Sequence, residues 1–175
     1  MANILLFGSH ELYALPNEIM VWLQEYVNQG HTFIVGDRKG ADSAFHKALS
    51  SLGASNVKIY AMDSAKNNTY EFPVRSFVTT YDSQSKTVEI YDKDTEEKMT
   101  DISGVEKEMD IPGNRQWYEF RDRQMINDCH IAICAYFGES KTVDHMIQIL
   151  NILNKPCYTF NMNWGLGYED WGRSR

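Results

Sequence analysis

Short apolar runs alternate with longer amphipathic stretches in the first third of the chain. Residues 3–7 form an apolar run that predicts a buried strand, and residues 16–28 carry apolar side chains at helical spacing, followed by Gly30 at a typical helix end. The same alternation continues to a third strand. The predicted strands are residues 3–7, 31–35 and 57–61, and the predicted helices are residues 16–28 and 41–52.

The pattern changes after residue 62 and resumes near residue 114. Residues 74–81 and 87–92 alternate around Asp-Ser-Gln-Ser-Lys, which predicts a β-hairpin. Residues 114–128 then predict a helix, 130–137 a strand, 142–153 a helix and 157–160 a last strand. We therefore expect one Rossmann-like domain over residues 1–175, with three α/β/α layers and a five-stranded parallel sheet. Numbered along the chain, its strands should lie in the order 3-2-1-4-5, with an insertion over about residues 63–113 that carries a projecting hairpin, and an irregular tail over 161–175.

Composition narrows the functional classes. The chain has 175 residues, 43% of them hydrophobic, without the ~20-residue apolar run of a membrane helix. Its three cysteines form no CxxC pair and its start lacks a secretory signal, so we expect reduced thiols and a cytoplasmic location. The net charge is −7, and residues 82–110 hold ten acids against four lysines. Without a basic face, nucleic-acid binding is disfavoured.

Three glycine-containing loops follow predicted strands, at residues 8–11, 36–42 and 138–142. Ligands of open parallel sheets bind at the carboxyl ends of the strands, near the point where strand order reverses. Single loops of this kind also occur for steric reasons alone, but three at one edge favour a ligand site. The candidate ligand-binding residues in them are Gly8, Ser9, His10, Gly36, Asp37, Lys39, Gly40, Ala41, Asp42, Gly138, Ser140, Lys141 and Thr142.

The loop at residues 36–42 is either a tight connection or a phosphate cradle. In the second interpretation, the amides of Gly40 and Ala41 donate hydrogen bonds to the ligand, and Gly36 makes room for it. Asp42 then braces the loop or a ribose hydroxyl. Arg38 and Lys39 either contact a phosphate or are simply solvated.

An arginine on an apolar helix face adds a fourth signal. Trp117, Arg121 and Met125 are spaced by four residues and share one face. A buried arginine needs an anion, which is either a ligand or an internal carboxylate such as Asp42. The sequence leaves both alternatives open.

Together these motifs resemble the SLOG superfamily, the Rossmann-like group that joins the Smf/DprA DNA-processing proteins to the Lonely Guy phosphoribohydrolases. The chain is most similar to its small standalone members related to YspA and YpsA. The resemblance rests on Gly-x-x-x-Gly-Ala-Asp at residues 36–42, Arg-Asp-Arg-Gln-Met at 121–125 and the strand at 130–134, and it covers roughly residues 3–62 and 115–160. It implies a nucleotide-binding site formed by the candidate loops and Arg121.

Departures from the family pattern concern catalysis. His10 stands where the family usually has arginine, and the Gly-Thr of the fourth loop is degraded at Lys141-Thr142. His145 falls at the position of the glutamate that cleaves N-glycosidic bonds in Lonely Guy enzymes. Arg121 and Asp144 are the remaining catalytic candidates, with Glu139 next, because the chemistry needs a carboxylate near the ribose.

The leading hypothesis is therefore a protein that binds a nucleotide or nucleotide-derived ligand, in the role of a sensor. The alternative is an N-glycosidase, of the phosphoribohydrolase or deoxyribosyltransferase kind, acting on nucleoside monophosphates. We expect no cofactor and no metal, because the histidines show no zinc spacing. The aromatic tail (Trp164, Tyr168, Trp171) is expected to dock on its own core. Capping the ligand and contacting a second subunit in a homodimer are its alternatives.

Overall fold

The computed structural model describes residues 1–62, 65–82, 84, 87–99 and 115–161. The described strands form one mostly parallel sheet, and four helices are described. The strands are β1 (Asn3–Gly8), β2 (Thr32–Val35), β3 (Val57–Met62), β4 (Val74–Asp82), β5 (Thr87–Asp92), β6 (Ile131–Tyr136) and β7 (Cys157–Asn161), and the helices are α1 (Asn17–Asn28), α2 (Ala41–Ser51), α3 (Arg115–Asp128) and α4 (Lys141–Ile152).

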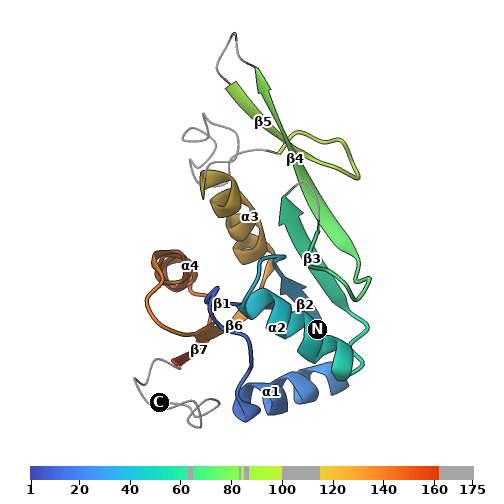
Figure 1. The fold of residues 1–175 in the computed structure, drawn as a ribbon, viewed down its shortest axis with the longest axis vertical. Coiled ribbons are helices and arrows are strands. Elements are labelled where there is room, and N and C mark those ends of the chain that lie inside the picture. The colour runs from blue at the N-terminus through green and yellow to red at the C-terminus, as the bar shows by residue number, and fades with distance from the viewer. Residues whose placement is uncertain (63–64, 83, 85–86, 100–114, 162–175) are drawn as a thin grey trace.

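Helices cover both faces of the sheet, as the sequence predicts. Figure 1 shows how the helices lie against the sheet. Ile4 and Leu6 pack with side chains of α1 and α2, whereas Leu5 and Phe7 pack with side chains of α3 and α4. Successive side chains of a strand point to opposite faces, so a strand between two helical layers must be apolar throughout. Each such side chain contributes about 1.5–3 kcal/mol by its burial. None of the described helices has the length and apolar character needed to cross a membrane.

The sheet has seven strands in the order β5-β4-β3-β2-β1-β6-β7, so the predicted five-stranded sheet is wrong. The five expected strands keep the relative order β3-β2-β1-β6-β7, and the hairpin extends the sheet beyond β3. Val74–Phe77 pairs in parallel with β3, and the rest of β4 pairs with β5 alone. The outer part of the hairpin therefore extends past the body of the protein (Figure 1).

Arg75 fastens the hairpin to the rest of the fold. Its Nε donates to Asp92 Oδ2 on β5 at 3.1 Å, and its Nη1 donates to Asp128 Oδ2 at the end of α3 at 2.9 Å. The guanidinium also lies 5.4 Å from the ring centre of Tyr60 and 5.1 Å from that of Phe77. These contacts join β3, both hairpin strands and α3.

Candidate functional site

A cleft lies at the carboxyl ends of β1, β2 and β6. In the sheet β1 lies between β2 and β6, and the strand order reverses at this point. The cavity volume of the cleft is about 20 Å³, and the cleft is partly open to solvent. Four separate segments form it: the loops after β1 and β2, helix α3, and the start of α4. The lining residues are Phe7, Gly8, His10, Arg38, Lys39, Asp42, Arg121, Asp122, Met125, Ser140, Thr142, Val143 and Met146.

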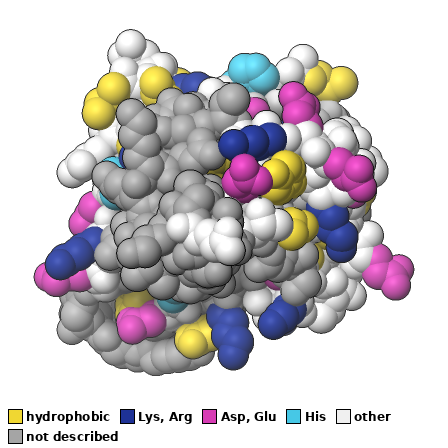
Figure 2. Space-filling model, turned by 90° about the horizontal axis from the view of Figure 1, so that it is seen from above, with side chains coloured by type: hydrophobic (Ala, Val, Ile, Leu, Met, Phe, Trp, Pro, Cys, Tyr) yellow, Lys and Arg dark blue, Asp and Glu magenta, His cyan; other side chains and the backbone are white. Residues whose placement is uncertain are grey.

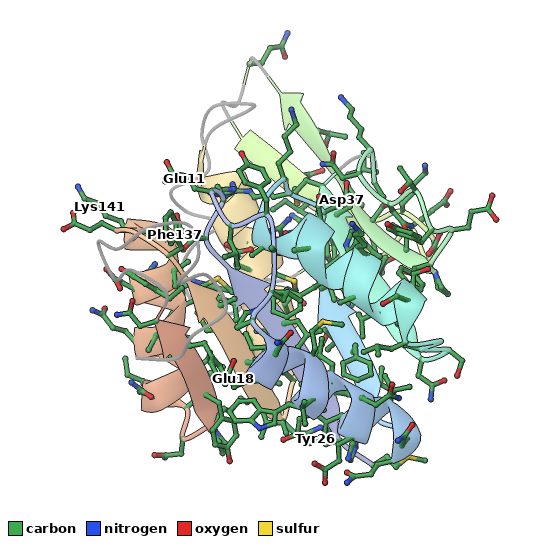
Figure 3. All side chains as sticks on the ribbon, turned by 60° about the horizontal axis from the view of Figure 1, so that its bottom comes forward. Glu11, Glu18, Tyr26, Asp37, Phe137 and Lys141 are labelled. Atoms are coloured by element: carbon green, nitrogen blue, oxygen red, sulfur yellow. The ribbon has the colours of Figure 1, made fainter. Side chains whose placement is uncertain are left out.

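The cleft brings together about half of the candidate residues. Those that line it are Gly8, His10, Lys39, Asp42, Arg121, Ser140 and Thr142, whereas Ser9, Gly36, Asp37, Gly40, Ala41, Gly138 and Lys141 are not among its lining residues. Glu11, Phe137 and Lys141 lie at the same end of the molecule, and Lys141 is at its outer margin (Figure 3). Lys141 is exposed to solvent rather than placed against the cleft.

Asp37, one of the predicted ligand-binding residues, is hydrogen-bonded inside the protein. Its side chain is buried, and Oδ2 accepts the backbone N–H of Asn67 at 3.1 Å. The side-chain amide of Asn67 donates in turn to the carbonyl oxygen of Asp37 at 2.7 Å. Asp37 therefore anchors the segment after β3 instead of facing the cleft.

The loops after β1 and β2 are bonded to each other, which changes the interpretation of residues 36–42. The N–H of Ala41 donates to the carbonyl oxygen of Ser9 at 3.0 Å, so this donor has a partner inside the protein. A Cβ on Gly40 would lie 2.0 Å from the carbonyl oxygen of His10, at a φ of +85°. Gly40 is thus required by the close approach of two loops. The loop at residues 36–42 also has an internal hydrogen bond, which the N–H of Arg38 donates to Asp42 Oδ2 at 2.9 Å.

Arg121 is paired inside the protein. Its Nε and Nη2 donate to Oδ1 of the neighbouring Asp122 at 3.1 and 2.6 Å, and both side chains are about 4% exposed. A Cβ on Gly36 would lie 2.5 Å from Asp42 Oδ2 and 2.9 Å from Arg121 Nη1. The absent side chain of Gly36 therefore makes room for this buried charge cluster. Burial raises the pKa of Asp42, while the guanidinium of Arg121 opposes the rise.

Two further side chains that line the cleft, Arg38 and His10, contact each other. Nη1 of Arg38 lies 2.9 Å from Nε2 of His10. A guanidinium cannot accept a hydrogen bond, so in this contact Arg38 donates and His10 Nε2 accepts. Lys39 is exposed beside them. Together with Arg121, the cleft holds three cationic side chains against the two carboxylates of Asp42 and Asp122.

The start of α4 forms the far wall. Ser140 caps this helix, because its side-chain oxygen accepts the N–H of Val143 at 3.2 Å. The catalytic candidate Asp144 is exposed and is absent from the cleft lining. Burial and a hydrogen bond to Asp144 raise the pKa of the Tyr136 hydroxyl, although the amide of Ser140 lowers it. His145 instead lines a small hollow between α3 and α4.

The cysteines do not contribute to the site. All three are free, and Cys129 and Cys134 are buried. Burial raises the pKa of Cys129 to about 11, which keeps its thiol protonated near neutral pH. Within the described parts of the chain, no group of three or more His, Cys, Asp or Glu side chains is arranged to hold a metal ion.

Several lining residues are missing from the sequence-based site list. Asp122 is one of them, although its adjacency to Arg121 in the sequence is a usable signal for an internal ion pair. Phe7, Val143 and Met146 are apolar and look like core residues in the sequence. The predicted tail and most of the connection before α3 lie outside the described residues. No protein-family model matches the chain, and comparisons with curated proteins and with solved structures find no significant match.

Proposed function

We propose that the cleft binds a nucleotide or nucleotide-derived ligand through its phosphate, as a binding or sensing site. The observation that carries this proposal is the gathering of Arg38, Lys39, Arg121 and the imidazole of His10 in one cleft of a chain whose net charge is −7. An acidic protein that concentrates cationic groups at a strand-order switch point is suited to an anionic ligand. The motif resemblance to SLOG proteins supports the same ligand class.

The roles of the residues follow from their pairing. Arg121 is compensated by Asp122, so it contributes to the shape of the cleft and to its field. Direct phosphate contacts fall to Arg38, Lys39 and the positive end of the α4 dipole. The N-glycosidase alternative gains no support, because Asp144 is not part of the cleft lining.

Calorimetric titration of the full chain with AMP, GMP, CMP and UMP tests the proposal. We expect at least one of these nucleotides to bind, and Lys39→Ala and Arg38→Ala each to weaken it about three- to tenfold, or ~1 kcal/mol. Lys58→Ala is the matched control, because Lys58 is an exposed lysine that does not line the cleft. Unchanged affinity in both cleft variants would refute nucleotide binding at this site.

A further inference from the structure

A second hollow lies on the other side of the loop that ends at Gly40. Its cavity volume is about 380 Å³, and it is open to solvent. Lys39 lines the cleft described above, whereas Gly40 lines this hollow, so one loop separates the two. We call it the tyrosine groove. The side chains that matter in it are Tyr13, Ser43, Lys47, Lys66, Asn67 and Tyr70.

Two aromatic rings stand exposed in the tyrosine groove. Tyr13 is 76% exposed and Tyr70 is 40% exposed. The ring of Tyr70 is tilted 36° to that of Phe72 at a centroid distance of 6.1 Å, and Phe72 packs edge-on against the buried His46. Tyr70 is thus supported from behind while part of its surface remains accessible. Such a ring provides a stacking surface at little cost in conformational entropy.

The wall that carries Tyr70 is held in place by hydrogen bonds. Asn67 is bonded through its backbone and its side chain to the buried Asp37. Asn68 and Phe72 exchange two further bonds, from Asn68 Nδ2 to the Phe72 carbonyl at 2.8 Å and from Phe72 N–H to Asn68 Oδ1 at 3.2 Å. Because this wall is ordered before binding, less conformational entropy is lost when a ligand binds.

The charge of the groove is positive. Lys47 on α2 and Lys66 on the opposite wall line it, and no acidic side chain is among its described lining residues. Ser43 and Asn67 add a hydroxyl and an amide that can bond to a base edge or a sugar. Stacking rings, two ammonium groups and neutral polar groups together fit a planar heteroaromatic ring that carries a phosphate.

We propose that the tyrosine groove is a second ligand site, which binds a nucleoside monophosphate by stacking its base on Tyr70 and Tyr13 and by pairing its phosphate with Lys47 or Lys66. This site is separate from the cleft and rests on different residues. The two sites place ligands on opposite sides of the loop at residues 36–42, so that loop is shared by both.

The test measures binding to the tyrosine groove in a variant whose cleft has lost two cationic side chains. In an Arg38→Ala/Lys39→Ala double variant, titration with AMP should still show one site. Adding Tyr70→Ala or Tyr13→Ala should weaken that binding about tenfold or more, the range expected for the loss of one stacked base. Tyr13→Phe should retain it, because the ring is preserved. Tyr158→Ala is the control, since Tyr158 is 48% exposed and lies on β7, outside the groove. Ribose 5-phosphate, which lacks the base, should bind at least tenfold more weakly than AMP.

The outcomes separate the two proposals. The proposal for the groove is refuted if the double variant binds no AMP or if neither tyrosine substitution weakens AMP binding. It is also refuted if ribose 5-phosphate binds as tightly as AMP. In the first of these cases, binding that is present in the original protein and lost in the double variant supports the cleft alone. If the double variant binds AMP with the original affinity and stoichiometry but loses it with Tyr70→Ala, the groove is supported and the cleft proposal fails.

Discussion

At the scale of single residues, Arg121 shows how a buried cation is accommodated. Its guanidinium is bonded to Asp122 and lies beside Asp42, and all three side chains are at most 8% exposed. A buried charge that loses its partner keeps the desolvation cost without the compensating attraction. Arg121 therefore contributes to the stability of the fold whether or not a ligand is bound.

The first prediction follows from this pairing. Arg121→Met should lower the free energy of unfolding by about 3–5 kcal/mol, because it leaves Asp122 buried and unpaired. The double variant Arg121→Met/Asp122→Leu should cost clearly less than the sum of the two single changes. Urea denaturation of the three variants measures this. An Arg121→Met protein of unchanged stability that no longer binds nucleotide would show that the arginine serves the ligand instead.

Gly40 and Gly53 give a second prediction because they share a positive φ but differ in their surroundings. A Cβ at Gly40 would lie 2.0 Å from the carbonyl oxygen of His10, whereas nothing lies within 4 Å of a Cβ at Gly53. Gly53→Ala should cost about 1 kcal/mol, which is the backbone strain alone. Gly40→Ala should cost several kcal/mol, since the loops after β1 and β2 must separate. Equal losses of unfolding free energy in urea would contradict the close approach of these loops.

At the scale of elements, the sequence pattern located every described helix and strand, mostly to within one residue. The periodicity was readable because both faces of the sheet are covered, so strands are apolar throughout and helices have one apolar stripe. The position of the hairpin in the sheet could not be predicted from the sequence. Whether it joins the sheet depends on the pairing of β4 with β3 and on contacts of Arg75 with Asp128, and these join residues far apart in the sequence.

The candidate site was predictable in location but not in detail. Parallel strands place their carboxyl ends at one edge, so the convergence of the three loops follows from strand order. The hydrogen-bond partner of each polar group, however, does not follow from strand order. The sequence could not show that Ala41 donates to Ser9 or that Asp37 faces Asn67, because both are three-dimensional contacts between separate segments.

The third prediction concerns the hairpin and pH. Burial raises the pKa of Asp92, but hydrogen bonds from Arg75, Asp94 and Thr95 outweigh it, so the pKa is lowered from 3.8. A lowered pKa in the folded state contributes stability above the ordinary aspartate value, and this contribution is lost as the pH falls through the lower, folded value. Asp92→Asn should therefore be less stable than the original protein at pH 7. The difference between the two should shrink as the pH falls below about 4.

Urea denaturation of both proteins between pH 7 and pH 2 measures this difference. Asp94→Asn is the control, because the side chain of Asp94 is exposed and its bond to Asp92 comes from the backbone N–H, which the substitution keeps. A difference that stays constant over the whole range would show that the Arg75–Asp92 contact does not depend on the charge of the carboxylate.

At the scale of the whole molecule, charge is distributed unevenly. On the face shown in Figure 2, acidic and basic side chains are interspersed among the described residues, without a continuous basic surface. Small groups of basic side chains instead line the cleft (Arg38, Lys39 and Arg121, beside Asp42 and Asp122) and the tyrosine groove (Lys47 and Lys66). Local concentration of this kind favours a small anion over an extended polyanion, which would need a long basic track.

The central claim is that the cleft at the carboxyl edge of the sheet binds a nucleotide. Amide chemical-shift mapping of the ¹⁵N-labelled full chain during titration with AMP tests it most directly, because it reports the position of the ligand as well as its affinity. The account predicts saturable shifts at residues 8–10, 38–39 and 140–143, and their loss in Lys39→Ala. Shifts at residues 43, 47 and 66–70 alone would place the nucleotide in the tyrosine groove. An absence of shifts at residues 8–10, 38–39 and 140–143 at saturating AMP would contradict the central claim.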